Sequence, residues 1–289
     1  MTFEHDNLSN SDIVQHCLDP NREIVGGALY GNLVVKLSEE VVVKFGRGVS
    51  AEEADNQRKA FELLDSSIVR VPQLYRYFTW SENDALPPNG FLVMEFVHGQ
   101  VFESAHSRQI NQIVKILSYF STIQSQRPGP LQTGVSRGLL WEENGEPAFK
   151  TVKQMERWLN FRLPDVESKL ALEEFPLVLC HLDLAPRNII WLEDGSVCLV
   201  DWASAGFYPR FFEVCLLKVM QHSHGDYELT LMERMEKLTE DEEAQMLLLA
   251  RSFYHGIRYS FVSFVYLPAI FVADNNDSSV QFRSVFRDT

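Results

Sequence analysis

The sequence has no long hydrophobic run, and its first twenty residues carry acids and polar groups throughout. A membrane-spanning helix needs roughly 20 consecutive apolar residues, and a secretory signal peptide needs a basic start followed by an apolar stretch. Neither pattern is present, so we expect a cytoplasmic protein with no membrane partner.

Cysteine is also scarce. The chain has four cysteines and no C-x-x-C pair: Cys17, Cys180, Cys198 and Cys215. The scattered spacing gives no sign of zinc or redox chemistry, and it is typical of small buried hydrophobic side chains.

Basic residues are outnumbered, with 26 Lys and Arg against 40 Asp and Glu and a net charge of -14. Nucleic-acid binding needs a concentrated basic surface, so nucleic acid is not expected as a partner. A cationic small molecule is compatible with the acidity, although solubility explains it equally well. The sequence leaves the oligomeric state open.

The most informative segment runs from Leu179 to Trp202. In it, His181, Asp183 and Asn188 form the pattern H-x-D-x-x-x-x-N, and Asp201 follows an apolar run. Either fragment alone is commonplace, but together they have the spacing that phosphoryl transfer requires. Such transfer depends on positioning a nucleotide, Mg²⁺ and an acceptor oxygen rather than on covalent chemistry.

Each of these polar residues has a candidate role. Asp183 would align the acceptor hydroxyl and accept its proton, with His181 bracing the loop. The apolar runs 189–191 and 197–200 flank a turn and predict a hairpin that returns Asp201 to the side of Asn188. Asn188 and Asp201 are then the expected Mg²⁺ ligands, because this ion takes few protein oxygens and completes its shell with phosphates.

The first part of the chain predicts mainly strands, and the second part mainly helices. We expect strands over 23–28, 32–37, 41–45, 74–80 and 91–97, an amphipathic opening over 11–17, and a helix over 50–64 with Ser50 and Glu53 as a capping box. Further helices are expected over 107–123, 152–161, 240–259 and 260–272. The predicted class is α+β, with an N-lobe over residues 1–98 and a C-lobe over residues 99–289. Residues 126–150 are predicted to form an ordered or partly ordered insertion, in which residues 139–141 pack against the rest of the protein.

Lys44 ends the apolar run 41–43, where strand alternation can point its ammonium inward to the nucleotide phosphates. Glu53 is the expected partner of Lys44, and Glu52 is the alternative. Glu53 can also simply cap its helix.

Backbone groups are expected to contact the rest of the nucleotide. The carbonyl of Glu95 and the amide of Val97 are candidates for adenine, in the strand that leads out of the N-lobe. Gly26 and Gly27 are candidates for a phosphate-covering loop, although their spacing does not match G-x-G-x-x-G.

Three neighbouring polar residues, His222, His224 and Asp226, lack the partners for tetrahedral metal coordination and are read as a solvated loop. Arg187 and Glu213 can be paired or structural, and the sequence does not decide between these.

The sequence resembles the aminoglycoside phosphotransferase-like family, in particular its fungal members. The resemblance is carried above all by two motifs, H-L-D-L-A-P-R-N-I-I-W and V-D-W-A-S-A-G-F-Y-P. Three further segments are similar to the same family: V-V-V-K-F-G, V-M-E-F-V-H-G and R-G-L-L-W-E-E-N-G. The resemblance implies a protein-kinase-like fold with an ATP site between a small strand-rich lobe and a larger helical lobe. It also implies that Asp183 is the catalytic base, Asn188 and Asp201 hold Mg²⁺, Lys44 binds phosphate and Glu53 is the helix glutamate.

The expected activity is therefore an ATP- and Mg²⁺-dependent transfer of phosphate to a small-molecule hydroxyl, with a cationic or sugar-like acceptor compatible. Leu182 replaces a glycine common in the family, and residues 185–187 differ from the H-P-G of antibiotic-modifying enzymes, which argues against an antibiotic as acceptor. A catalytically silent pseudokinase that binds nucleotide or partners is the alternative from another class. A protein kinase is disfavoured, because Trp202 and Ala203 follow Asp201 where Phe-Gly is expected, and no A-P-E segment follows.

Overall fold

The computed structural model describes residues 7–27, 31–83, 86–102, 107–132, 134–141, 147–163, 167–221 and 223–259. The expected helix over 260–272, the tip of the glycine loop at 28–30 and His222 lie outside these residues. Within them, no helix is both long and apolar enough to cross a membrane.

The strands of the N-terminal part form a five-stranded antiparallel sheet in the order β1-β2-β3-β5-β4. Its members are β1 (Ile24–Gly27), β2 (Leu33–Lys36), β3 (Val41–Gly46), β4 (Leu74–Trp80) and β5 (Asn89–Glu95). All five predicted strands are thus confirmed, with ends that differ by at most two residues.

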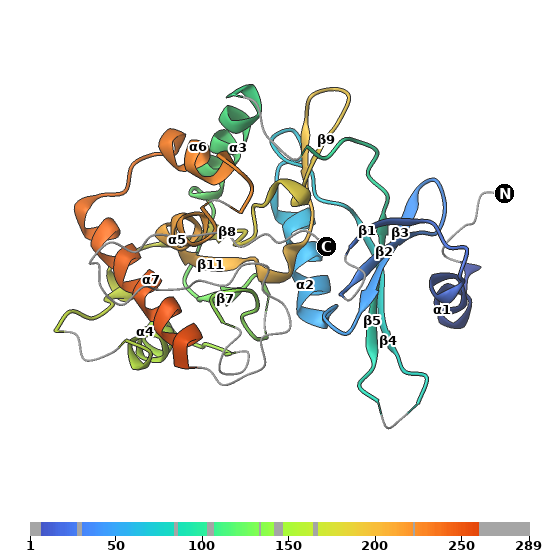
Figure 1. Ribbon diagram of the computed structural model, residues 1–289, viewed down its shortest axis with the longest axis horizontal. Helices are drawn as coiled ribbons and strands as arrows, with labels where there is room; N and C mark the ends of the chain where they lie inside the picture. Colours follow the sequence, from blue (N-terminus) through green and yellow to red (C-terminus); the bar gives the residue numbers. More distant parts are fainter. Residues whose placement is uncertain are drawn as a thin grey trace, which may run out of the picture.

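Alternation along β3 gives the sheet two different faces. Val41, Val43 and Phe45 pack with α1 (Asn10–Leu18) on the outer face. Val42 packs on the opposite face, toward α2 (Ala51–Leu63). Since successive strand residues point to opposite faces, Lys44 shares the inner face with Val42. Figure 1 shows α2 between this sheet and the helical part of the molecule.

Helix α2 begins with the predicted cap, because the Ser50 hydroxyl accepts a hydrogen bond from the Glu53 amide at 3.2 Å. The reciprocal half of the capping box is absent, since the Glu53 side chain is turned to Lys44 instead. One face of the helix is buried although it is largely polar: Glu53, Ala54, Asn56, Gln57 and Ala60.

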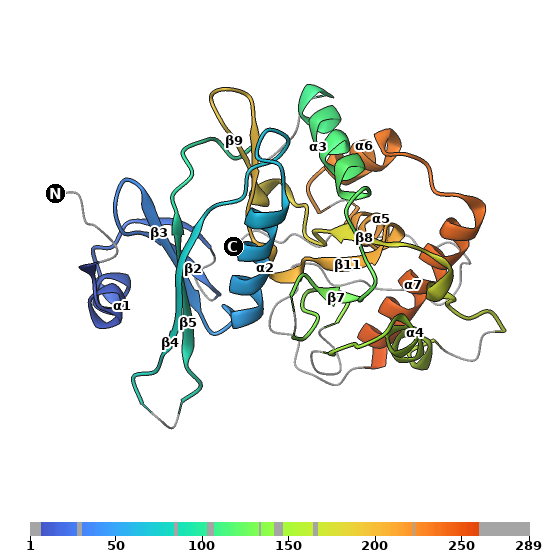
Figure 2. The same cartoon turned by 180° about the vertical axis from the view of Figure 1, so that it is seen from behind.

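The second part of the chain is mainly helical, which confirms the α+β class with a strand-rich and a helical lobe (Figures 1 and 2). Its helices are α3 (Ser107–Phe120), α4 (Val152–Phe161), α5 (Phe211–Val219), α6 (Tyr227–Arg234) and α7 (Glu240–Tyr259). The predicted helices over 152–161 and 240–259 have the expected bounds, and α3 ends three residues earlier than predicted.

Helices α5 and α6 were not predicted. Seven of the nine residues of α5 are buried, so it carries no polar stripe from which a helical period could be read. The sequence pattern also missed a small four-stranded sheet, made of β6 (Gln124–Ser125), β8 (Leu177–Cys180), β11 (Gly206–Pro209) and β7 (Gly129–Pro130) in that order.

The predicted insertion over 126–150 does pack down in its described parts. β7 pairs with β11, and Leu140 and Trp141 are buried. The Trp141 ring stacks on Tyr208 with ring centroids 5.4 Å apart. This segment therefore belongs to the core of the helical lobe.

Candidate active site

The hairpin of β9 (Ile189–Trp191) and β10 (Val197–Leu199) brings the two ends of the segment 188–201 together. Ile189 pairs with Leu199, and the Val200 amide donates to the Asn188 carbonyl at 3.0 Å. Asn188 and Asp201 therefore lie at the same end of the hairpin, although Asp201 comes thirteen positions after Asn188 in the sequence.

Asp201 meets the N-lobe at this end. Lys44 Nζ lies 2.9 Å from Asp201 Oδ1 and 2.7 Å from Glu53 Oε1. Glu53 is 1% exposed, and the Lys44 side chain is 10% exposed. Glu52, the alternative partner, pairs instead with Arg137 at 3.1 Å. One ammonium thus joins a strand, a helix and the second lobe.

Burial and charge oppose each other in this group. Burial works to lower the pKa of Lys44, but the carboxylates of Glu53 and Asp201 outweigh it and raise the pKa. Burial also works to raise the pKa of Asp201, yet the Lys44 ammonium holds it below its ordinary value. Burial raises the pKa of Glu53 to about 7, against the influence of Lys44. Lys44 and Asp201 therefore stay charged at neutral pH.

Asp183 lies in the loop between β8 and β9 and accepts three side-chain hydrogen bonds. Asn188 Nδ2 donates to Asp183 Oδ2 at 2.8 Å and to the Asp183 carbonyl at 2.9 Å. Arg187 Nη2 lies 2.8 Å from Oδ1 and 2.9 Å from Oδ2. The Asp183 side chain is 31% exposed, so its carboxylate can meet a molecule from solvent.

His181 has a supporting place. It is fully buried, and its ring packs edge-on against Trp202 with centroids 4.8 Å apart. Burial lowers the pKa of His181, although Asp183 and Asp201 both work to raise it. The ring is therefore influenced by both carboxylates but does not face solvent, which fits bracing rather than contact with substrate.

The backbone at the two carboxylates is unusual. Leu182 and Asp201 have φ angles of 60° and 64°, the left-handed region that few non-glycine residues adopt. Leu182 is where the resembling family often has glycine, and the angle explains that preference. The buried Glu213 stabilises the turn by accepting from the amides of His181 at 2.7 Å and Leu182 at 3.1 Å.

Asn56 ties α2 to the turn that follows Asp201. Its Nδ2 donates to the carbonyls of Trp202 at 3.0 Å and Ala205 at 2.9 Å, and its Oδ1 accepts from the Leu131 amide at 2.9 Å. Asn56 is 1% exposed, so these bonds satisfy groups that water does not reach. The helix that carries Glu53 is thereby fixed to the segment that carries Asp201.

The remaining predicted nucleotide contacts are placed at the edges of the N-lobe. Glu95 ends β5, and its side chain pairs with Arg70 at 2.6 Å, so any contact with adenine would use its backbone. Val97 follows in the linker, where Gln100 bonds to Trp191 of β9. Gly26 and Gly27 lie in β1, and Gly27 has a φ of 94° at the point where the strand enters the loop.

The donor set suits a magnesium ion. Because Asn188 turns its Nδ2 to Asp183, its amide oxygen is left for a metal. The Asp201 side chain is 34% exposed, and Lys44 occupies only its Oδ1. In the described part of the chain, no group of three or more His, Cys, Asp and Glu could hold a metal. One carboxylate and one amide oxygen, completed by phosphates, is the sparse type of site that Mg²⁺ uses.

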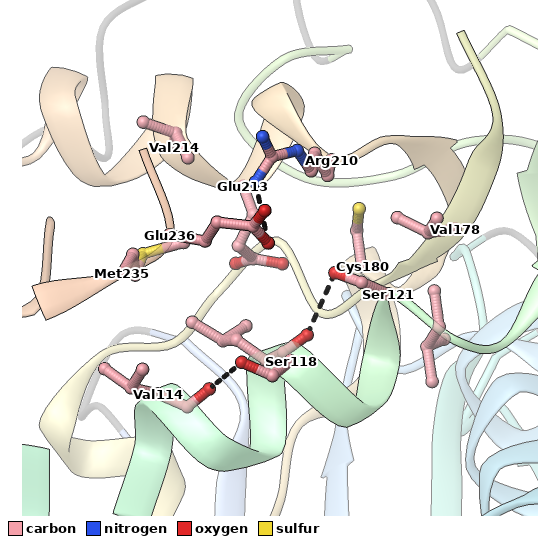
Figure 3. A pocket seen from close by; sticks show the side chains of 12 residues that line it. Val114, Ser118, Ser121, Val178, Cys180, Arg210, Glu213, Val214, Met235 and Glu236 are labelled. Carbon is pink, nitrogen blue, oxygen red and sulfur yellow. Dashed lines mark hydrogen bonds and ion pairs between the residues drawn. The ribbon is translucent and has the colours of Figure 1, made fainter. Parts of the chain in front are cut away.

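A small pocket is lined by residues of β8, by residues in α3 and α5 and directly beside them, and by Met235 and Glu236 (Figure 3). Arg210 and Glu236 form an ion pair across it at 3.5 Å. Glu213 stands between this pocket and the backbone of the loop, since it lines the pocket and bonds His181. Lys44, Asp183 and Asp201 do not line it, so it is separate from the cluster of charged groups.

Sequence reasoning missed several members of the site. Asn56 was readable in principle, because polar residues at positions 53, 56 and 57 share one helix face with Ala60. Arg187 and Glu213 were left undecided. His224 was read as solvated, but its Nδ1 lies 2.5 Å from Glu228 Oε1 and its Nε2 lies 3.5 Å from Arg187 Nη1. The contact between His224 and Arg187 joins segments far apart in the sequence, so no local sequence pattern indicates it.

The model of the phosphotransferase enzyme family matches residues 22–226, which include Lys44, Glu53 and the whole segment from His181 to Asp201. The chain belongs to the phosphotransferase enzyme family. Mouse ethanolamine kinase 2 is 33% identical over 69 residues, a match that covers 24% of this chain and 16% of that protein. This chain therefore corresponds to only a small part of that relative.

Solved structures show the same fold at low sequence identity. The apo form of a thermostable aminoglycoside phosphotransferase APH(4)-Ia is similar with a TM-score of 0.51 and 11% identity, over 82% of this chain and 88% of that one. The GDP and kanamycin complex of APH(2")-IIia gives a TM-score of 0.50 and 16% identity, over 85% and 88%. The chain thus has the protein-kinase-like fold of small-molecule phosphotransferases.

Proposed function

We propose that this phosphotransferase uses ATP and Mg²⁺ to phosphorylate a hydroxyl group of a small molecule. The observation that carries the proposal is Asp201, which pairs with Lys44 of the N-lobe while lying beside Asn188 and the Asp183 loop. A single residue thereby joins the groups suited to a nucleotide with the groups suited to an acceptor.

The proposed roles follow from the contacts. Lys44, held by Glu53, would bind the nucleotide phosphates. Asn188 and Asp201 would hold Mg²⁺, which when bound bridges phosphate oxygens and neutralises charge that develops during transfer. Asp183 would orient the acceptor hydroxyl and take its proton. Glu95 and Val97 would meet adenine through their backbone, and Gly26 and Gly27 would lie near the phosphates.

The acceptor class is inferred from charge. The net charge of -14 and the local match to an ethanolamine kinase both support a cationic acceptor such as an amino alcohol. A sugar-like acceptor is the next class, and an aminoglycoside ranks behind it because residues 185–187 read Ala-Pro-Arg.

A panel assay tests the proposal. Purified protein with ATP and Mg²⁺ is incubated with amino alcohols, sugars and aminoglycosides, and ADP and the phosphorylated product are measured. We expect Mg²⁺-dependent product formation with at least one amino alcohol or sugar, lost in Asp183→Ala. Nucleotide binding without turnover on the whole panel would favour the pseudokinase alternative, and phosphate transfer to protein hydroxyls would favour a protein kinase.

A further inference from the structure

Asp183 is held on both of its carboxylate oxygens, which is unusual for a group that has to accept a proton. Arg187 Nη2 contacts Oδ1 at 2.8 Å and Oδ2 at 2.9 Å, and Asn188 Nδ2 contacts Oδ2 at 2.8 Å. Each carboxylate oxygen can accept two hydrogen bonds. Oδ2 is therefore filled, and the free acceptor position of Asp183 is on Oδ1.

Arg187 is itself in contact with a second segment. Its Nη1 lies 3.5 Å from His224 Nε2, and His224 Nδ1 lies 2.5 Å from Glu228 Oε1. An ionised carboxylate only accepts hydrogen bonds, so the neutral His224 ring carries its proton on Nδ1. The lone pair on Nε2 then faces the guanidinium of Arg187.

Glu228 anchors this arrangement in the helical lobe. It is 2% exposed and lies in the first turn of α6, where Tyr227 and Leu231 are buried as well. Helix α6 packs on α3 and α5. The far end of the chain of contacts is therefore fixed by the core, whereas the Arg187 side chain is 56% exposed.

We propose that Glu228, His224 and Arg187 form a positioning chain for Asp183, which directs the Oδ1 lone pair of Asp183 toward the acceptor hydroxyl. This inference rests on the proposed function, since it assigns positioning residues to the same reaction. Glu228 orients the ring of His224, His224 holds Arg187, and Arg187 fixes the plane of the carboxylate. Arrangements in which a carboxylate orients a histidine that orients the next group are common around reactive centres.

A simple surface ion pair between Arg187 and Asp183 would behave differently. Exposed pairs of this type contribute little, and losing His224 would then leave Asp183 unaffected. The positioning chain instead makes the effects of Arg187 and His224 dependent on each other, which a double-mutant cycle measures.

The first experiment measures Mg²⁺-dependent ATP turnover, with water as the acceptor, in Arg187→Gln, His224→Ala and the double variant. We expect kcat to fall about tenfold in Arg187→Gln and about threefold in His224→Ala, with KM for ATP within about twofold of the parent. The double variant should be no worse than Arg187→Gln. Arg187→Lys should recover only part of the rate, because lysine has a single nitrogen, whereas Arg187 uses Nη2 for Asp183 and Nη1 for His224.

Arg58→Gln is the matched control. Arg58 pairs with Asp55 on the exposed side of α2, and its loss should leave kcat unchanged. Three results would each overturn the positioning chain. They are a kcat of the double variant that falls by the product of the two single effects, an unchanged kcat in His224→Ala, and a change in KM for ATP with kcat unaffected.

The second experiment does not depend on activity. Nitrogen NMR of protein with labelled histidine, at about pH 8 where ordinary histidine is neutral, reports which ring nitrogen carries the proton. The His224 signal is identified by its loss in His224→Ala. We expect the Nδ1-protonated form, with the Nε2 signal shifted in Arg187→Gln. The Nε2-protonated form would overturn the proposal even in an active enzyme. A protein that neither binds nor turns over Mg·ATP would refute the proposed function while this spectrum still decides the contacts.

Discussion

On the proposed nucleotide side of the site, Lys44 and Glu53 form a buried ion pair, and Lys44 also pairs with Asp201, which is 34% exposed. On the proposed acceptor side, the pair of Asp183 and Arg187 has no buried member, since the two side chains are 31% and 56% exposed. The nucleotide side draws on both lobes. The acceptor side draws only on the catalytic loop and the start of α6.

This difference has a physical consequence. A buried charge needs its partner, so the nucleotide side depends on how the sheet, α2 and the β9–β10 hairpin pack together. An exposed charge tolerates changes in its surroundings, so the acceptor side can vary without loss of the fold. The nucleotide side should therefore report on stability, and the acceptor side on rate.

The largest expected effect is on the acceptor side. Asp183→Asn removes the proton acceptor while keeping the size of the side chain, and we expect kcat to fall by about 10²–10⁴-fold. Because Asp183 is partly exposed, affinity for Mg·ATP and the unfolding free energy should change little. Steady-state turnover and calorimetric titration measure these quantities. A variant that retains the parental rate would remove Asp183 from its proposed role.

The next effect is on the nucleotide side. Lys44→Met leaves the carboxylates of Glu53 and Asp201 without their shared cation, and breaking such a buried pair costs about 3–5 kcal/mol. Urea unfolding measures the loss. Lys59→Met is the matched control, since Lys59 and Glu62 form an exposed pair on α2 whose loss should cost less than about 1 kcal/mol. Equal stability of the two variants would contradict the contrast between the two sides.

Asn56→Ala tests the connection between the lobes. It removes the hydrogen bond of the Ala205 carbonyl and that of the Leu131 amide, while the Trp202 carbonyl keeps a bond from the Ala205 amide at 3.2 Å. Each buried group left unpaired costs about 1–3 kcal/mol. We expect a loss of roughly 2–4 kcal/mol in urea unfolding together with weaker Mg·ATP binding. Asp55→Ala, at the exposed neighbouring position, should leave both unchanged. A stability loss without any change in nucleotide affinity would show that Asn56 does not influence Asp201.

The smallest effect concerns Glu213 and pH. Burial raises the pKa of Glu213 to about 7, above the value of 4.5 expected in the unfolded chain, so the folded state binds more protons between these values. Stability then falls as pH rises through that window. We expect the unfolding free energy of the parent, measured relative to Glu213→Gln, to decrease by roughly 2–3 kcal/mol from pH 5 to pH 8. A relative stability that rises with pH would contradict the assigned burial.

The comparison also explains what the sequence could predict. Residues 41–46 alternate on a strand and residues 50–64 begin with a recognisable cap, so Lys44 and Glu53 could be located from local patterns. The spacing from His181 to Asp201 contains a hairpin, so the loop and the metal ligands could be located as well. Their catalytic roles stay predictions.

Other members could not be found in this way. Arg187, His224 and Glu228 come from two segments that meet only through the packing of α6 on α3 and α5. Helix α5 is buried on nearly all sides and therefore shows no helical period. Contacts that depend on such packing leave no trace in local sequence, which is why the acceptor side was the less predictable half.

In the proposed function, Asp201 joins a metal-bound nucleotide to the loop that carries Asp183. Calorimetric titration with ATP, in the presence and absence of Mg²⁺, tests it in the parent and in Asp201→Asn, which keeps the shape of the side chain. We expect Mg²⁺-dependent binding of ATP in the parent and its loss in the variant. Equal ATP affinity with and without Mg²⁺ in the parent, or unchanged Mg·ATP affinity in Asp201→Asn, would contradict it.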